Sequence, residues 1–285
     1  MNKRLKLATK ILIAVCFIGL AILAYPKFAN YWNESHSTKM IAGYSDALNK
    51  LSEDKNREMW TNAVKYNQEI ASLPNQRLMS VERKQQYEVV LNVDGNGVMG
   101  FIDIPKIGVS LPLYHGTSSN VLQVAVGHIE WTSLPVGGVG THCAVSGHRG
   151  LPSAKLFTDL NKLREQDTFT VNVLNQVLTY EVDQIRTVLP NETDGILIEE
   201  GMDYCTLITC TPYGINTHRL LVRGHRIENT QKGATVISEA VLVDQLIVAF
   251  YLAVPLIFIL FMKVMLTKPP KKKPAVIIPK EESKL

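Results

Sequence analysis

The sequence predicts an all-β domain of eight short strands, preceded by an α-helical arm and held between two membrane-spanning helices. Three patterns lead to this prediction. Short β-prone runs fill residues 98–228, apolar residues recur at helical spacing within residues 27–97, and a long apolar run lies near each end of the chain. The 285 residues therefore leave room for one sizeable globular domain between the apolar segments.

The first apolar run, residues 11–26, follows a basic tail at residues 1–10. The run carries no charged side chain, and this pattern suits either a signal peptide or a retained membrane anchor. It leads into Tyr25-Pro26-Lys27-Phe28, which contains no small-x-small site for signal peptidase. A retained transmembrane anchor is therefore favoured, while cleavage after the run stays an open alternative.

The second apolar run, residues 246–266, has about the 20 residues that a helix needs to cross a bilayer. Lys263 lies near its end, where a long side chain can reach the headgroups. The basic tail at residues 267–285 belongs in the cytoplasm by the positive-inside rule, as does the basic N-terminus. The residues between the two runs then lie on the extracytoplasmic face. A buried core helix is the alternative, but this run is apolar on every side.

The net charge of +4 comes largely from lysines near the two ends of the chain. A nucleic-acid-binding surface would instead spread basic residues over the folded domain. The charge therefore indicates membrane topology, and no nucleic-acid partner is expected.

Residues 27–97 are predicted to form the helical arm. Apolar residues recur there at spacings of three and four, which is typical of an amphipathic helix or helix pair. They are Tyr44, Leu48 and Leu51, followed by Met59, Ala63, Tyr66 and Ile70. Ser52 suits the N-cap of the second helix. The polar composition of Leu73–Gln86 predicts a linker or a lid-like segment.

Eight short strands are predicted within residues 98–228. The β-prone runs are separated by Gly, Pro, Asn and Asp. They are Met99–Ile104, Leu111–Tyr114, Val124–Gly127, His142–Ser146, Thr168–Val173, Leu178–Val188, Asp203–Cys210 and Arg219–Arg226. This pattern indicates an antiparallel barrel or sandwich, with one helical turn around Ala154–Leu163. A polar linker, residues 229–245, leads to the second apolar run.

Three cysteines, Cys143, Cys205 and Cys210, lie in the outward-facing part, because Cys16 falls inside the first apolar run. An oxidising compartment tends to pair cysteines, so an odd number leaves at least one thiol to be explained. Cys205 and Cys210 share one predicted strand, where an odd separation puts side chains on opposite faces. A disulfide between these two is not expected.

Cys210 ends a β-prone run and is followed by the chain-breaking Thr211-Pro212-Tyr213-Gly214. A strand end fixes the Cβ atom, while the loop leaves sulfur open to substrate and offers a backbone N–H to an oxyanion. A free thiol is mostly protonated at neutral pH, so a nucleophile here needs a cationic neighbour. The position suits a nucleophile; core packing is the simpler alternative for a cysteine in a strand.

Two basic residues are candidates for that neighbour. Arg219 opens the next strand across a short hairpin, and His148 stands at another strand end. An imidazole can give and take a proton, whereas a guanidinium stays charged. His148 therefore suits a general acid and base, and Arg219 suits a clamp for a carbonyl or oxyanion. Spacing alone does not bring the three residues together.

Thr206-Leu207-Ile208-Thr209-Cys210 resembles the Thr-Leu-x-Thr-Cys signature of sortases, and its continuation through Gly224 resembles the pilus-building class C branch. Gly100–Ile107 is similar to the opening strand of that family, and Ala144–Arg149 is similar to its histidine segment. The resemblance covers about residues 98–226.

This resemblance implies an eight-stranded sortase β-barrel and a cysteine transpeptidase. Cys210 would form a thioester, His148 would be the general acid and base, and Arg219 would stabilise the transition state. Thr209 would help to position the substrate. The implied reaction cuts an LPxTG-like sorting signal after its threonine and transfers the acyl group to a lysine amine of another pilin.

The implied partners are pilins or other surface proteins that carry the sorting signal, and neither a cofactor nor a metal is expected. The catalytic domain would work at the cell membrane on the extracytoplasmic face, with both termini in the cytoplasm. Many class C sortases also carry an Asp-Pro-aromatic lid anchor before the barrel. This sequence contains no such tripeptide, so whether Leu73–Gln86 covers the site stays open.

Other functions stay open as alternatives. A housekeeping-type sortase would pass the acyl group to a peptidoglycan precursor, and a hydrolytic cysteine peptidase would pass it to water. Papain-like enzymes place the cysteine before the histidine, unlike this chain. A non-enzymatic membrane-tethered scaffold would need neither residue. A metal site built from Cys205, Cys210, His218 and His225 fits poorly, because the two cysteines face apart.

Overall fold

The computed structural model describes residues 3–229. The second apolar run, the basic tail and nearly all of the linker before them lie outside this range, so their predicted places are not tested. The helices are α1 (Lys3–Asn49), α2 (Glu53–Ala71), α3 (Val81–Val89) and the short α4 (Ser119–Leu122). Single 3₁₀ turns occupy η1 (Pro105–Ile107), η2 (Leu160–Lys162) and η3 (Asp194–Ile196).

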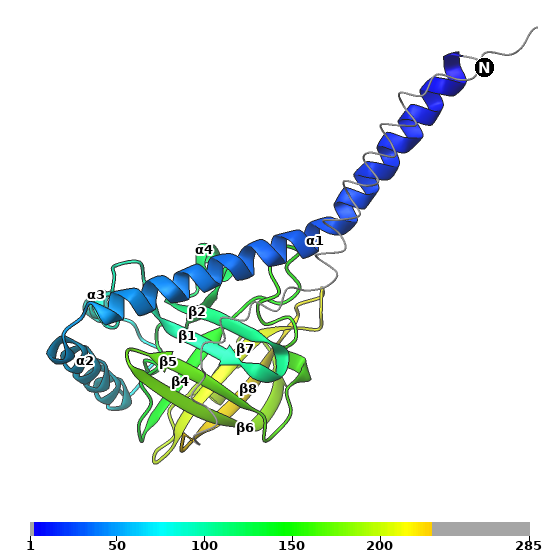
Figure 1. The fold of residues 1–285 in the computed structure, drawn as a ribbon. Helices are drawn as coiled ribbons and strands as arrows, with labels where there is room; N and C mark the ends of the chain where they lie inside the picture. The colour runs from blue at the N-terminus through cyan, green and yellow to red at the C-terminus, as the bar shows by residue number, and fades with distance from the viewer. Residues whose placement is uncertain (1–2, 230–285) are drawn as a thin grey trace, which may run out of the picture. The chain divides into compact units, whose positions relative to one another are not determined.

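Eight strands close into a barrel in the order β1-β2-β3-β4-β7-β8-β6-β5 (Figure 1). They are β1 (Val98–Ile104), β2 (Val109–His115), β3 (Val126–His128), β4 (Thr141–Ser146), β5 (Thr168–Val173), β6 (Gln176–Val188), β7 (Asp203–Thr211) and β8 (His218–Ile227). Each strand overlaps a predicted one, and the ends differ by no more than two residues. The predicted eight-stranded barrel is therefore confirmed.

Two neighbouring pairs of strands are parallel, which differs from the antiparallel arrangement that the sequence predicts. These are β2 with β3, and β4 with β7. A parallel pair needs a crossover connection. The segment containing α4 supplies the first, and the β5–β6 hairpin with the loop after it supplies the second. The β4–β7 pair matters for function, because it brings the C-terminal ends of both strands to the same end of the barrel.

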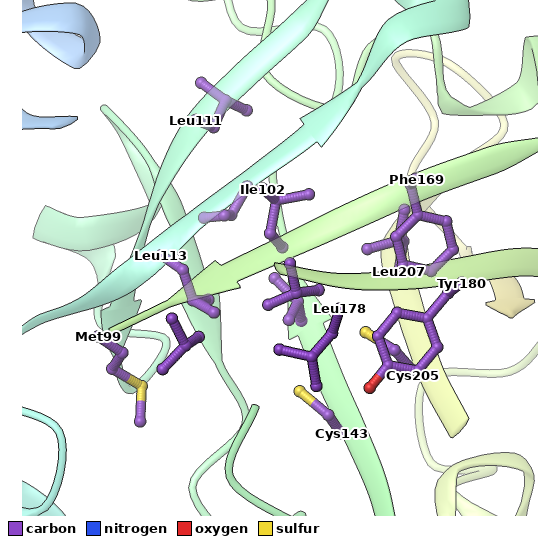
Figure 2. Packing of buried hydrophobic residues seen from close by; sticks show 14 of the residues in the cluster. Met99, Ile102, Leu111, Leu113, Cys143, Phe169, Leu178, Tyr180, Cys205 and Leu207 are labelled. Carbon is purple, nitrogen blue, oxygen red and sulfur yellow. The ribbon is translucent and has the colours of Figure 1, made fainter. Parts of the chain in front are cut away.

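Inward-facing side chains fill the barrel, so it is a packed core rather than a channel. Figure 2 shows Phe169 and Tyr180 lying over each other near Cys205 and Leu207. The two rings stack with centroids 5.6 Å apart. Burial of apolar surface contributes roughly 25 cal/mol per Å² and is the main stabilising term here.

Helix α1 joins the predicted membrane anchor to the arm without a break. The sequence predicts a separate amphipathic helix near Tyr44, but one helix of 47 residues includes that segment, with Pro26 inside it. It is long and apolar enough to cross a membrane. The anchor and the arm are therefore one structural element.

The second half of α1 lies along β1 and β2 (Figure 1). Tyr44 is buried there: its hydroxyl donates to the carbonyl of Met99 at 2.9 Å and accepts from the amide of Leu174 at 2.8 Å. Burial raises the pKa of Tyr44 to about 12, so the phenol stays neutral. These two buried hydrogen bonds fix the helix to the barrel.

Helices α2 and α3 complete the arm. The predicted N-cap of α2 is confirmed, since the hydroxyl of Ser52 accepts from the amide of Lys55 at 3.2 Å. Helix α3 was not predicted, because its residues 81–86 fall in the stretch expected to be a linker or lid. Ser80 caps it, but Tyr87 is its one buried residue. A helix with one core contact leaves no apolar periodicity for the sequence to reveal.

Candidate active site

Cys210 and Arg219 lie directly opposite each other on the antiparallel strands β7 and β8. Both residues are half-buried. Directly opposite residues of a strand pair point to the same face of the sheet, so Cys210 and Arg219 are cross-strand neighbours. The hairpin therefore supplies the first half of the predicted constellation.

His148 reaches the same end of the barrel through the parallel pair β4–β7. Ser146 pairs with Ile208, and the amide of Gly147 continues the ladder by donating to the carbonyl of Ile208 at 3.0 Å. Gly147 therefore lies level with Thr209. The next residue is His148 on one segment and Cys210 on the other. Cys210 and Arg219 thus lie on β7 and β8, and His148 lies two residues after the end of the neighbouring β4, at the same rim.

Thr209 ties these two segments together. Its hydroxyl donates to the carbonyl of Gly147 at 2.7 Å, and the side chain is only 1% exposed. A Cβ atom on Gly147 would lie 2.7 Å from the ring of Phe157, so the backbone before His148 passes too close for any side chain. Packing against Phe157 therefore requires glycine at position 147.

A small apolar cluster covers the outer face of the barrel next to Cys210. Side chains alternate along a strand, so Ile208 and Leu221 share the face of Cys210 and Arg219. The cluster comprises Ala144, Val188, Ile196, Ile208 and Leu221, with Ile129 and Trp131 packed against it. The five main members of the cluster are buried, so a packed apolar layer lies directly beside the cysteine.

The loop between β7 and β8 borders the site on its other side. Arg149 donates to the hydroxyl of Thr211 at 3.1 Å, and its guanidinium lies 5.9 Å from the ring centroid of Tyr213. The guanidinium of Arg219 donates to the loop carbonyls of Asn216 and His218 at 3.2 and 3.1 Å. The rim around Cys210 is therefore positively charged.

The segment between α2 and α3 packs against the loop that follows β6. Gln76 accepts from the amide of Ile198 at 3.0 Å, and Arg77 pairs with Asp194 and donates to Thr193 at 3.0 Å. Arg77 also lies 6.0 Å from the ring centroid of Trp131, a member of the apolar cluster. The sequence left open whether this segment covers the site, because its partners lie more than 100 residues away.

Three other histidines have structural surroundings. His128 is fully buried: Nε2 lies 2.8 Å from the carbonyl of Ser133, so it donates, and Nδ1 accepts from Tyr87 at 3.0 Å. His142 is also fully buried, and this burial lowers its pKa to about 4. His115 contacts two backbone carbonyls, and burial lowers its pKa. Each ring therefore joins parts of the fold.

Cys143 and Cys205 differ from Cys210 in their surroundings. They face each other on β4 and β7 inside the barrel, and both are free thiols. The hydrogen bond with Cys143, together with burial, raises the pKa of Cys205 well above its ordinary value. A buried neutral thiol is a poor nucleophile. Within residues 3–229, no cluster of three or more His, Cys, Asp or Glu side chains is arranged to hold a metal ion.

The sequence of residues 102–227 matches the family model of the sortase domain. Sortase A of Bacillus anthracis is 26% identical over 234 residues, which cover 81% of this chain and 100% of that protein.

Solved structures give higher identities. Sortase C1 from Streptococcus agalactiae is 48% identical with a TM-score of 0.66, covering 67% of this chain and 100% of that one. Sortase C of Streptococcus pneumoniae is 41% identical with a TM-score of 0.60, covering 67% and 98%. Sortase C of Clostridium perfringens, solved with the C-terminal cell wall sorting motif, is 40% identical with a TM-score of 0.60, covering 67% and 100%.

Proposed function

This chain belongs to the sortase family and is a cysteine transpeptidase of the class C type, and we propose that it joins pilin subunits with Cys210, His148 and Arg219 as its catalytic residues. The observation that carries the proposal is the meeting of β4, β7 and β8 at one rim. Cys210 and Arg219 are cross-strand partners there, and the segment before His148 is bonded to β7.

In the first half of the reaction, the Cys210 thiolate attacks the carbonyl carbon of the threonine in an LPxTG-like signal. The peptide bond to the following glycine breaks, and His148 gives a proton to the leaving amine. The product is a thioester between the threonine and Cys210. Arg219 donates hydrogen bonds to the oxyanion that forms during the attack.

In the second half, a lysine amine of another pilin attacks the thioester carbon while His148 takes its proton. An isopeptide bond forms, the bond between carbon and sulfur breaks, and the Cys210 thiolate and the protonated His148 are restored. No atom is left over, and neither a cofactor nor a metal ion takes part.

Thr209 acts in this proposal as a positioning residue. Its side chain is buried and bonded to Gly147, so it holds the histidine segment beside the cysteine instead of contacting the substrate. Its role in placing the substrate is therefore indirect.

Pilins are the proposed substrates because of the relatives. The Streptococcus pneumoniae structure is described as providing insights into pilin substrate specificity, and the Clostridium perfringens enzyme was solved with the C-terminal cell wall sorting motif. The partly buried Ile129 and Trp131, which pack on the apolar cluster beside Cys210, are apolar side chains that an extended peptide would contact.

The proposed location is the outer face of the cell membrane. Helix α1 supplies an anchor of sufficient length, and its basic start favours a cytoplasmic N-terminus. The second apolar run and the basic tail after it would return the chain to the cytoplasm.

Incubation of the protein with an LPxTG-type peptide and a lysine-bearing pilin domain tests this function. We expect an isopeptide-linked product with the wild type and with Cys143→Ala, and none with Cys210→Ala. Transfer to a peptidoglycan-like amine in preference to the lysine would indicate a housekeeping sortase instead. Release of the free acid alone, in the presence of both amines, would indicate a hydrolase.

A further inference from the structure

Helix α1 contacts the barrel very soon after it leaves the predicted membrane span. The side-chain oxygen of Asn30 accepts from the amide of Lys155 at 2.7 Å, and the side-chain amide of Asn33 donates to the carbonyl of Val124 at 3.3 Å. Asn30 follows the end of the predicted span, residues 11–26, by four residues. At 1.5 Å per helical residue, the first contact lies roughly 6 Å beyond the span.

Both contacts lie at the catalytic end of the barrel. Lys155 belongs to the loop after His148, where the amide of Phe157 donates to the carbonyl of His148 at 3.1 Å. Val124 precedes β3, in which Gly127 pairs with Ser146 at the end of β4. The membrane-proximal part of α1 is therefore attached beside the catalytic rim.

The opposite end of the barrel is held by a later part of the same helix. Tyr44 bonds to Met99 at the start of β1 and to Leu174 in the β5–β6 turn. That turn is remote from Val188, the β6 residue that pairs with Arg219. The helix thus runs along the barrel from the catalytic rim to the far end, so the rim is the end nearer the predicted membrane span.

Near Asn30 and Asn33, the surface of α1 that faces away from the barrel carries a cluster of aromatic side chains. Tyr25, Phe28, Tyr31 and Trp32 are all exposed, Trp32 by 67%. At 100° per residue they lie on the side of α1 opposite Asn30 and Asn33. Tyrosine and tryptophan are enriched at membrane–water interfaces, and this cluster fits the outer headgroup layer.

The rim itself has the composition of a membrane-contacting surface. Its loops expose the apolar side chains Leu189, Tyr213 and Ile215, next to the cations Arg149 and Arg219. Apolar groups beside cations suit a surface of anionic lipid headgroups.

Two acidic side chains near the rim, Glu192 and Asp194, are engaged within the protein. Asp194 pairs with Arg77, and Glu192 accepts from the amide of Leu189 at 2.9 Å.

We propose that the catalytic rim rests on the surface of the bilayer that anchors the chain. Helix α1 then acts as a rigid spacer that fixes the height of Cys210 above the headgroups. The substrates served at this height are polypeptides tethered in the same membrane, with the sorting signal only a few residues from their own anchor. This inference rests on the proposed function for its substrate, but not for its geometry.

Energy transfer in vesicles tests the geometry without any activity. In a Cys16→Ala, Cys210→Ala background, the remaining thiols, Cys143 and Cys205, are buried. A membrane-impermeant donor dye is placed outside the vesicles on Ile215→Cys or on the matched control Val139→Cys, which is 83% exposed before the start of β4. The two positions lie roughly 25 Å apart along the barrel, from about 3.3 Å per strand residue and the strand tilt.

With acceptor-labelled headgroups, we expect clearly higher transfer from position 215 than from position 139. Equal transfer from both positions, or higher transfer from position 139, would overturn the proposed orientation.

A height change tests the consequence for substrates. Seven helix-forming residues inserted between Lys27 and Phe28 raise the barrel by about 10 Å with almost no rotation. We expect turnover of a sorting peptide on a short membrane tether to fall about tenfold or more, while turnover of the same peptide in solution is unchanged. A long flexible tether should restore the loss.

Equal turnover of the short-tethered peptide by both proteins would contradict the spacer role. Absence of turnover of the soluble peptide by the wild type would instead contradict the proposed function.

Discussion

The hydroxyl of Thr209 donates a hydrogen bond to the carbonyl of Gly147 at 2.7 Å, which joins the residue before the cysteine to the residue before the histidine. The bond is buried and crosses the parallel pair β4–β7. It therefore couples the positions of His148 and Cys210, although 62 residues separate the two strand ends.

Replacement of Thr209 by valine tests this coupling. Thr209→Val keeps the shape but leaves a buried carbonyl unpaired, which costs about 1–3 kcal/mol of stability. We expect kcat to fall by about one to two orders of magnitude with little change in KM, because a small misplacement of His148 slows proton transfer. Thr209→Ser should recover most of the kcat.

Thr179→Val is the matched control for that variant. The hydroxyl of Thr179 donates to Asn229 at 2.9 Å at the far end of the barrel. The Thr179→Val protein should be less stable than the wild type but should keep its kcat. A similar loss of kcat in both variants would show that Thr209 acts only through stability.

Arg219→Lys tests the role of the guanidinium. An ammonium keeps the charge but not the planar fork of donors, so oxyanion stabilisation should weaken and kcat/KM should fall by about 100-fold. Arg186→Lys, an exposed position on β6, is the control and should behave as the wild type. Unchanged steady-state kinetics for Arg219→Lys would remove this residue from the mechanism.

Arg77→Ala tests whether the segment before α3 is held over the apolar cluster. The contact with Asp194 is an exposed ion pair and is worth at most about 1 kcal/mol. We expect chymotrypsin to cleave near Leu73 and Leu78 a few times faster. Arg57→Ala, which removes an exposed ion pair within α2, is the control and should leave that cleavage rate unchanged.

Turnover of a soluble sorting peptide by Arg77→Ala should rise by a similar factor, because the cluster beside Cys210 becomes more accessible. Wild-type rates of both cleavage and turnover in Arg77→Ala would show that this segment is not a cover for the site.

His142 predicts a pH dependence of stability. Its pKa is about 4 in the folded protein and 6.5 in an unfolded chain, because burial disfavours the charged form. Between these values the unfolded chain binds more protons, so stability falls as the pH drops from about 6.5 to about 4. The loss is on the order of 3 kcal/mol.

Denaturant titrations at several pH values measure the slope of the free energy of unfolding against pH. His142→Asn should flatten it, whereas His36→Asn, which changes an exposed histidine of α1, should keep the wild-type slope. Equal acid slopes in the wild type and His142→Asn would assign the loss to other groups.

The strands could be predicted from sequence because each is a β-prone run bounded by turn residues. The pairing of Cys210 with Arg219 follows from a local hairpin, so the sequence nearly determines it. The approach of His148 does not follow from any local pattern. It depends on the parallel pair β4–β7, whose strands are far apart in the sequence and are joined through the intervening β5–β6 hairpin.

Two parts of the arm could not be predicted for related reasons. Helix α3 makes one buried contact through Tyr87, too few to produce a period. The place of Arg77 is set by Asp194 and Trp131 on distant loops. The sequence also does not predict that α1 continues past Pro26. The composition changes there from apolar to amphipathic, whereas the backbone stays helical.

The most direct test of the central claim is the mass of the acyl-enzyme. After brief incubation with an LPxTG-type peptide and no amine, the intact protein should gain the mass of the peptide up to its threonine. The adduct should map to Cys210, be released by hydroxylamine, and be absent from Cys210→Ala but present in Cys143→Ala. An adduct on another residue, or peptide cleavage that persists in Cys210→Ala, would contradict the assignment of Cys210 as the nucleophile.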